Sequence, residues 1–292
     1  MPRAALMAAR TSSHFLFSFI KMQTGSRTWA GILLVLGLAA AGPAFSDWAL
    51  NMPRGATTIS REVFDLHMMV LWVCTIIGVG VYGAMVYALI RFRKSAGAQP
   101  AKFTHNTKAE VIWTTIPALI LVARAVPSAE TLIRMEDARG SEITIQVTGY
   151  QWRWHYDYID DGVRFFSSLD AASNDARRLR SGIDPATVDN YLLEVDNPVV
   201  VPVDTKVRLL ITAADVLHSW WVPDFAVKKD AVPGFINEVW FEATETGTYR
   251  GQCAELCGRD HAFMPIVVNV VGADEYTAWL EERREETASR VY

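Results

Sequence analysis

Five side chains in the second half of the chain could together bind a soft metal. The segment GQCAELCGRDHAFMP supplies two thiols, an imidazole and a thioether, and a second imidazole stands upstream in DVLHSWWVP. These donors are Cys253, Cys257, His261, Met264 and His218. Ligands of this softness select copper over magnesium or calcium. A mononuclear copper site needs only one of the two thiolates, so the second indicates a bridged copper pair over which an electron can be shared.

Three other interpretations remain open on spacing alone. A disulfide between Cys253 and Cys257 would suit an oxidising compartment but would leave the histidines and Met264 unused. A tetrahedral zinc site of two cysteines and two histidines is chemically sound but has no use for a thioether. Unrelated placement can explain a lone His or Met, though it explains five donors on two loops poorly. Cys74 lies in an apolar segment and is expected to be a small buried hydrophobic residue.

The donors lie in a region with the texture of an all-β domain. Short β-branched and aromatic runs, such as EITIQVTGYQW, KVRLLIT and MPIVVNVV, are separated by Gly, Pro, Asn and Asp. Several runs alternate in polarity with a period of two, which predicts a sandwich or barrel over 140–272. The polar stretch 170–190, with three arginines, predicts a surface insertion.

The end of the chain has a different pattern. Residues 273–292 are predicted to form a helix and a tail, with the helix from Ala273 to Arg283. Trp279 and Leu280 are its candidates for docking against the β domain.

The first of three apolar stretches in the first half resembles a targeting segment. It covers residues 29–41 and is followed by Ala44-Phe45-Ser46, with small residues at the spacing of a cleavage site. This pattern predicts an N-terminal extension and signal peptide over 1–46, with an uncleaved helix as the alternative. Met22 is an alternative start of the chain.

The other two apolar stretches predict a transmembrane hairpin over 62–135. Met68–Ile90 holds 23 residues without a charge, enough at ~1.5 Å per residue to cross a ~30 Å hydrocarbon layer. Val111–Val126 is shorter, contains Pro117 and Arg124, and taken alone could be a buried soluble helix. A charge near the bilayer centre costs at least ~2.5 kcal/mol, so we expect the arginine to snorkel outward or to face a partner subunit.

Charge predicts how the hairpin is oriented. The loop between the two stretches carries five basic residues and one acid, Glu110, so the positive-inside rule assigns it to the cytoplasm. The region 130–272 holds 22 acidic and 13 basic residues, a net charge of −9, and would attract a basic partner outside the membrane. The whole chain has a net charge of −4, which argues against binding to nucleic acid. With 51% hydrophobic residues, the chain has ample material for a core.

Taken in order, five motifs resemble subunit II of the haem-copper cytochrome c oxidases, the subunit with the dinuclear CuA centre. They are FTHNTKAEVIWT, GYQWRWHYDY, DVLHSW, KKDAVPG and GQCAELCGRDHAFMPI, and the resemblance covers the chain from about Thr58. It implies an all-β cupredoxin-like Greek-key barrel preceded by the two-helix hairpin, in a bacterial inner membrane with the C-terminal domain in the periplasm. Electrons from cytochrome c would pass to haem in subunit I, with subunit III as a further partner, for oxygen reduction coupled to proton pumping.

The resemblance also implies the metal ligands. The side chains that match copper ligands are His218, Cys253, Cys257, His261 and Met264. Glu255 matches the residue whose backbone carbonyl completes the copper shell. Its carboxylate matches a ligand of a shared magnesium or manganese ion, a hard ion that suits oxygen. Without the resemblance, Glu255 would be taken for a surface acid.

Four further residues receive roles in the same way. Trp152 matches the residue that accepts the electron from cytochrome c, although a core aromatic would be the simpler interpretation. Glu110 matches an acid at the cytoplasmic mouth of a proton path, although an acid at this position more simply caps a helix. Asp157 and Asp196 match positions of an acidic docking face for cytochrome c.

The chain departs from the family pattern at four positions. Arg153 and His155 lie beside the proposed electron acceptor and make the expected docking surface less acidic there. Phe235 stands where the family has an arginine, which puts one polar contact toward the haem subunit in doubt. Arg124 replaces an apolar residue of the second membrane helix.

Four rival functions remain to be compared with the oxidase hypothesis. A quinol oxidase relative would lack the copper donors that this chain retains. A copper chaperone with a Cys-x-x-x-Cys pair would be thioredoxin-like, with alternating helices. Nitrous-oxide reduction needs a histidine-rich second cluster, which the six histidines of this chain cannot supply. The fourth rival is a docking module held by zinc or a disulfide and without redox activity.

Overall fold

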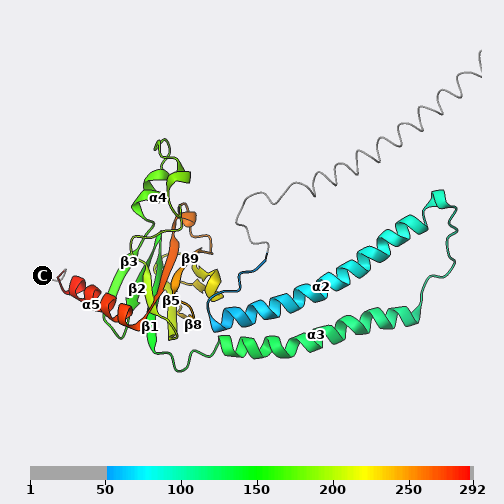
Figure 1. The fold of residues 1–292 in the computed structure, drawn as a ribbon, viewed down its shortest axis with the longest axis horizontal. Coiled ribbons are helices and arrows are strands. Elements are labelled where there is room, and N and C mark those ends of the chain that lie inside the picture. The colour runs from blue at the N-terminus through cyan, green and yellow to red at the C-terminus, as the bar shows by residue number, and fades with distance from the viewer. Residues whose placement is uncertain (1–50, 290–292) are drawn as a thin grey trace, which may run out of the picture. The chain divides into compact units, whose positions relative to one another are not determined.

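The computed structural model describes residues 51–289, which form a helical hairpin, a β domain and a C-terminal helix (Figure 1). The predicted signal peptide and the alternative start at Met22 lie outside these residues.

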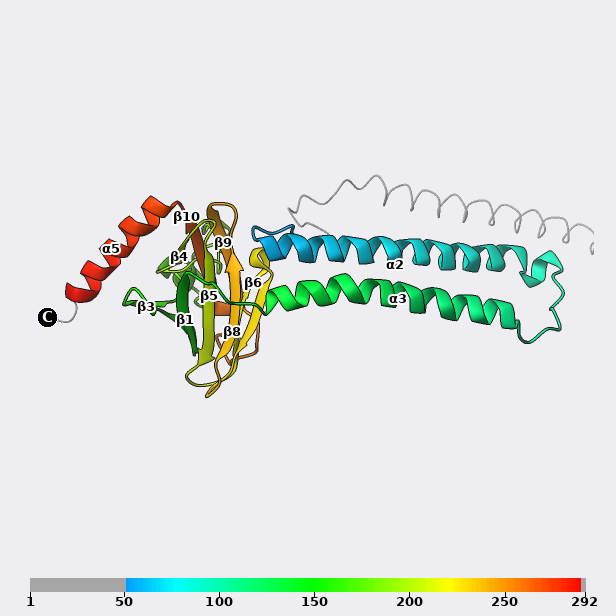
Figure 2. The same cartoon turned by 90° about the horizontal axis from the view of Figure 1, so that it is seen from below.

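The predicted hairpin consists of two long helices, α2 (Thr58–Arg91) and α3 (Thr107–Met135). Thr57 caps α2 in a reciprocal arrangement with Ser60, and Asn106 caps α3 through the amide of Ala109. Both helices are long and apolar enough to cross a membrane. Figures 1 and 2 show them side by side along their lengths, and they run in opposite directions.

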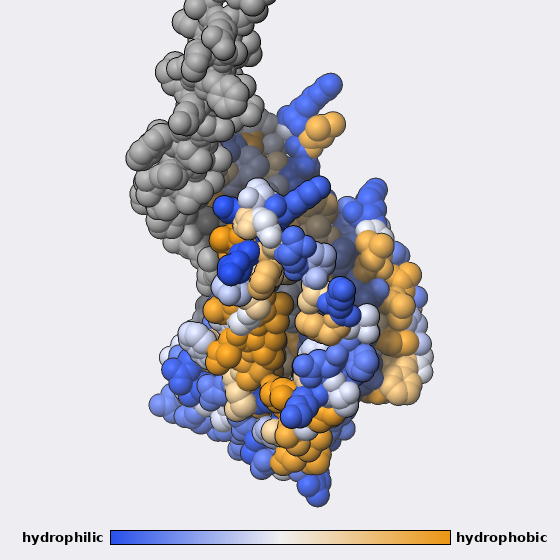
Figure 3. Space-filling view, turned by 90° about the vertical axis from the view of Figure 1, so that its right-hand side faces the viewer, coloured by the Kyte–Doolittle hydropathy of each residue, from blue (hydrophilic) through white to orange (hydrophobic). Residues whose placement is uncertain are grey.

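The surface of the hairpin is hydrophobic. Ile76 and Val79 of α2 and Leu121 of α3 each leave about seven-tenths of their surface exposed, a pattern that suits contact with lipid chains. Figure 3, which looks toward the hairpin, shows hydrophobic surface in orange.

Arg124 finds its contacts within the hairpin itself. Its guanidinium lies 2.7 Å from the sulfur of Met69 and donates to the carbonyl oxygen of Leu66 at 3.3 Å, both on α2. Its Nε has no hydrogen-bond partner. Within this chain, the contacts of Arg124 are therefore with the neighbouring helix α2.

The β domain contains two five-stranded sheets. The first has the order β3 (Val163–Ser167), β2 (Arg153–Tyr158), β1 (Ile143–Tyr150), β5 (Lys206–Ala213) and β8 (Asn237–Glu242). The second has the order β4 (Val199–Pro202), β10 (Pro265–Val271), β9 (Gly247–Cys253), β6 (His218–Val222) and β7 (Val227–Ala231). β1 pairs with β5, and β4 with β10, in parallel, whereas the other strand pairs are antiparallel. The fold is the expected cupredoxin-like β domain.

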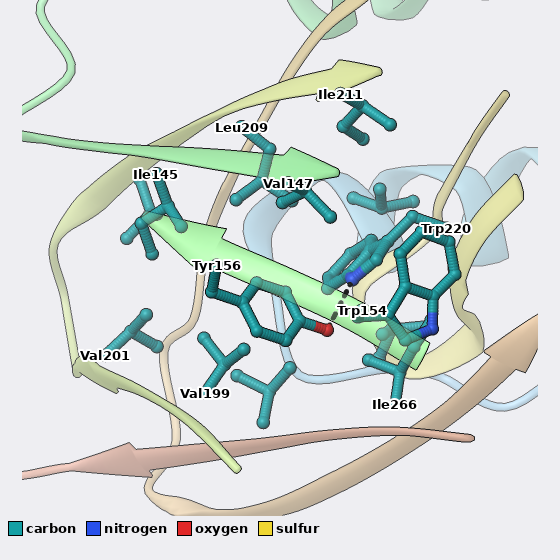
Figure 4. Close-up of a cluster of buried hydrophobic side chains, with 14 of the residues drawn as sticks. Ile145, Val147, Trp154, Tyr156, Val199, Val201, Leu209, Ile211, Trp220 and Ile266 are labelled. Atoms are coloured by element: carbon teal, nitrogen blue, oxygen red, sulfur yellow. Dashed lines mark hydrogen bonds between the residues drawn. The ribbon is translucent and has the colours of Figure 1, made fainter. Parts of the chain in front are cut away.

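Alternation of side chains builds the core between the sheets. On β2, Trp154, Tyr156 and Tyr158 are buried, while the residues between them are more exposed. Figure 4 shows Trp154, Tyr156 and Trp220 packed among aliphatic side chains. The indole of Trp220 donates to the hydroxyl of Tyr156 at 3.2 Å, so the polar groups of both buried rings are satisfied.

The insertion (residues 170–190) is buried in part, although its polar sequence predicts an exposed surface segment. It contains the short helix α4 (Ala171–Ala176), capped by Asp170, and a single 3₁₀ turn. Ser173 and Ala176 are buried, and the hydroxyl of Ser173 accepts from the amide of Leu192 at 3.1 Å. The insertion therefore packs on the domain in part.

The C-terminal helix α5 (Ala273–Ser289) confirms the predicted docking but extends beyond Arg283. The Trp279 ring lies 5.3 Å from the Tyr158 ring, and Leu280 is buried. Arg284 forms an ion pair with Asp161 at 2.8 Å, which anchors the additional turn.

Candidate metal centre

Strand pairing brings the predicted donors together. His218 opens β6, Cys253 closes β9, and the pairing of Trp220 with Cys253 aligns these two strands. β9 then pairs with β10 across the loop 254–264, so the amide of Cys253 donates to the carbonyl oxygen of Met264 at 3.2 Å. The loop must therefore fold back over the end of β6.

The donor atoms form one cluster. Cys253 Sγ lies 3.9 Å from both Cys257 Sγ and His218 Nδ1. Cys257 Sγ lies 3.5 Å from His261 Nδ1 and 3.7 Å from Met264 Sδ. The carbonyl oxygen of Glu255 lies 3.3 Å from Cys253 Sγ. The six groups predicted from the sequence as candidate ligands thus lie next to one another.

The cluster is largely removed from water. His218, Cys253, Cys257 and Met264 are buried, whereas His261 and Glu255 are half-buried. Burial, with the neighbouring Cys253, raises the pKa of the Cys257 thiol to about 12. The thiol therefore remains protonated at neutral pH until a metal displaces the proton.

The composition of the cluster fits copper best. Both cysteines are free, so they remain available as ligands. The sulfur of Met264 is part of the cluster, although a tetrahedral zinc site of two cysteines and two histidines would leave it unused. Two thiolates, two imidazoles, a thioether and a carbonyl therefore suit a pair of copper ions.

Asp215, which no sequence motif singles out, orients His218. Its Oδ1 lies 3.0 Å from His218 Nε2, which leaves Nδ1 directed toward the cysteine. Burial opposes its ionisation, but hydrogen bonds from His218 and the amides of Gln151 and Val216 hold the pKa of Asp215 below its usual value. The carboxylate therefore keeps the proton on Nε2 and the lone pair on Nδ1. A spacing of three residues carries no signal for this contact.

Gly149 makes room for the same imidazole. A Cβ atom at this position on β1 would lie 2.8 Å from Cδ2 of His218, which is too close for a real contact. A side chain there would displace the ring, so the glycine in GYQW is required by the approach of two strands.

Trp152 lies against the loop that carries the ligands. Its indole nitrogen donates to the carbonyl oxygen of Cys257 at 3.3 Å, and the side chain of Gln151 donates to the same oxygen at 2.8 Å. Gly258 has a φ of +121°, and a Cβ there would lie 3.2 Å from the indole. The ring is thus one hydrogen bond from a candidate ligand, and it is half-buried.

The other candidate residues lie away from the cluster. Glu110 is in the first turn of α3, where it accepts from the amide of Asn106 at 3.3 Å and so acts as the expected helix cap. Asp157 is on the half-exposed face of β2. Asp196 is exposed and accepts from the amide of Ser168 at 2.7 Å, so it stabilises a turn.

Two of the departures from the family pattern, Arg153 and His155, lie on β2, which begins directly after Trp152. The guanidinium of Arg153 stacks 4.0 Å from the Phe166 ring, and His155 packs 4.7 Å from the same ring. Burial lowers the pKa of His155, so this side chain is neutral at pH 7. Phe235 is exposed between β7 and β8.

Comparisons with known proteins agree along the chain. The family described as the periplasmic domain of cytochrome c oxidase subunit II matches residues 143–271, and the transmembrane domain of that subunit matches residues 45–131. The probable cytochrome c oxidase subunit 2 of Rickettsia felis is 38% identical over 291 residues, which cover 97% of this chain and 88% of that protein. Subunit 2 of Cereibacter sphaeroides is 37% identical over 276 residues, with 89% and 91% covered.

A solved structure also resembles the β domain. The periplasmic domain of the oxidase subunit II of Bradyrhizobium japonicum is 41% identical, with a TM-score of 0.45, and the match covers 51% of this chain and 98% of that one. The family matches and the relatives identify a membrane protein with a periplasmic C-terminal domain. The chain belongs to the cytochrome c oxidase subunit II family and is a subunit of a haem-copper oxidase, an oxidoreductase complex.

Proposed function

We propose that this chain is the subunit through which electrons reach the oxidase. It accepts single electrons from a cytochrome c at a dinuclear copper centre and passes them to haem in subunit I, where oxygen reduction is coupled to proton pumping. The observation that carries the proposal is the convergence of six donor groups from β6, the end of β9 and the loop 254–264 in a mostly buried cluster. Bound there, a copper pair would supply one-electron transfer with the charge change spread over two ions.

The residues around the cluster have distinct tasks under this proposal. The ligands are His218, Cys253, Cys257, His261, Met264 and the carbonyl oxygen of Glu255. Asp215 orients one imidazole, and the burial of the cluster excludes water. Burial limits the reorganisation of solvent when the charge changes.

Trp152 is the proposed point of electron uptake. Its ring contacts the ligand loop through the carbonyl oxygen of Cys257, and it is exposed in part. A flat aromatic group in that position can touch a docked haem protein on one side and the loop on the other. Asp157 and Asp196 would contribute to docking of the cytochrome.

Two further tasks involve partners of the chain. The carboxylate of Glu255, which is half-buried at the cluster, would bind a magnesium or manganese ion shared with subunit I. Glu110 would take up protons at the cytoplasmic end of α3 in addition to capping the helix. Subunit III completes the proposed complex in the bacterial inner membrane.

Metal content of the purified oxidase complex tests the copper proposal. We expect two copper ions per copy of this chain and a purple colour. The double substitution Cys253→Ser/Cys257→Ser should remove both, because it deletes both thiolates. Cys74→Ser is the matched control and should retain them, since Cys74 lies in α2, outside the cluster. A colourless complex with one zinc ion per chain would contradict the proposal, as would copper that survives loss of both thiols.

A further inference from the structure

The insertion contacts the turn that presents two of the proposed ligands. That turn is a short 3₁₀ helix, His261–Phe263, followed directly by Met264. Arg177, at the end of α4, places its guanidinium 4.3 Å from the Phe263 ring centroid and 3.6 Å from a carboxylate oxygen of Asp260. One arginine of the insertion therefore contacts residues on both sides of His261.

The ion pair between Arg177 and Asp260 is partly shielded from solvent, and the carboxylate of Asp260 points toward the arginine. The side chains of Arg177 and Asp260 are 26% and 16% exposed, so their attraction is less screened than that of a surface pair. Asp260 stands at the N-cap of the 3₁₀ turn, yet its side chain makes no capping hydrogen bond. Its carboxylate is instead directed toward Arg177 and toward Arg259, whose Nε lies 3.4 Å away.

The insertion can hold this arginine in place because its base is fixed. Leu169 and Val195 pair as an antiparallel bridge, and the amide of Asp170 donates to the carbonyl oxygen of Glu194 at 3.2 Å. The carboxylate of Glu194 pairs with Arg250 of β9 at 2.6 Å, on the strand that ends in Cys253. The side chain of Asn174 also accepts from Nε of Arg177 at 2.8 Å, which orients the guanidinium.

We propose that Arg177 is a positioning residue for the copper centre. It fixes the turn that carries His261 and Met264 by stacking on Phe263, and it offsets the charge of Asp260 beside His261. This inference rests on the proposed copper function. Groups that orient metal ligands typically change metal affinity by about 10–100-fold when they are removed.

The test compares substitutions in the assembled oxidase complex. For Arg177→Ala we expect copper to be lost to a chelator about tenfold faster than in the wild type. We also expect a lower reduction potential, because less of the negative charge of Asp260 is offset and the oxidised centre is favoured. Arg177→Lys, which restores the charge, should recover much of the potential. A purely structural role would leave the potential unchanged in complexes that retain copper.

Arg178→Ala is the matched control, because Arg178 is adjacent, largely exposed and paired with Asp175 within the insertion. It should behave as the wild type in both measurements. If Arg177→Ala does not assemble, Arg177→Met keeps the aliphatic stem on Phe263 and removes only the charge, and its potential should be lowered. If a copper-loaded Arg177 variant has the wild-type reduction potential and loses copper at the wild-type rate, the inference is wrong, whereas the proposed function still holds. A wild-type complex without copper would overturn the proposed function, and the inference with it.

Discussion

At the scale of single residues, the candidate ligands depend on neighbours that hold them in place. Asp215 accepts from one nitrogen of His218, and Gly149 leaves the space that the ring occupies. The side chain of Gln151 donates to the carbonyl oxygen of Cys257, and its backbone amide donates to the carboxylate of Asp215. The cluster is therefore pre-organised by hydrogen bonds and close packing on both of its sides.

Substitution of Asp215 tests this pre-organisation. An asparagine at this position can donate to Nε2 of His218, and this favours the tautomer with the proton on Nδ1, the nitrogen that faces the cysteine. For Asp215→Asn we expect copper affinity to fall by about 10–100-fold, measured by competition with a chelator in the purified complex.

Asp160→Asn is the control for this substitution, because it removes the same charge in the exposed turn between β2 and β3. It should leave the copper affinity at the wild-type value. Equal affinities for wild type and Asp215→Asn would show that the carboxylate does not set the tautomer.

The candidate ligands could be named from the sequence, and the residues that hold them in place could not. Four of the candidate ligands lie within twelve residues, namely Cys253, Cys257, His261 and Met264. Their residue types and spacing indicate a soft-metal site. Asp215 and Arg177 act through contacts that exist only after strands and insertion have folded. Arginines in a polar stretch are usually solvated, so nothing in the sequence separates Arg177 from Arg178.

At the scale of elements, hydrophobic patterning predicted the types correctly and the boundaries less well. The helix α2 begins ten residues before the apolar stretch at Met68, because Thr57 and Ser60 form its cap among polar residues. Similarly, α5 continues past Arg283, and Arg284, Glu285 and Glu286 favour helix but are exposed. Caps and ion pairs set these ends, and their strength depends on tertiary partners that a sequence does not display.

The docking of α5 can be tested by truncating its aromatic anchor. Trp279 contacts the rings of Tyr158 and Phe165 in the β domain, so Trp279→Ala removes an aromatic contact that joins this helix to the domain. We expect it to lower the free energy of unfolding by about 3 kcal/mol, the low end for a large aromatic, because the indole is only half-buried.

Thermal unfolding of the full chain in detergent measures this effect. Glu282→Ala, on the exposed side of the same helix, should leave the melting temperature unchanged. If Trp279→Ala melts with the wild type, the contacts of Trp279 do not contribute to the stability of the domain.

At the scale of the whole molecule, charge is distributed unevenly. The region 130–272 has a net charge of −9, yet two arginines stand beside the proposed point of electron uptake. Arg259 lies 5.4 Å from the Trp152 ring and is largely exposed, and Arg153 stacks on Phe166 nearby in the sequence. A basic cytochrome would therefore be attracted by the domain at long range and repelled locally.

These two effects predict that removing an acidic residue and removing an arginine change the rate of electron uptake in opposite directions. With a basic cytochrome c, the second-order rate of electron uptake by the wild-type complex should fall as salt is added, because the Debye length shortens to about 8 Å at physiological ionic strength. Asp157→Asn should lower the rate at low salt, and Arg259→Gln should raise it, with both differences vanishing at high salt. Stopped-flow mixing over a range of ionic strength measures all three. A rate independent of salt in the wild type would remove steering by the acidic domain, and a slower Arg259→Gln would mean that this arginine attracts the donor.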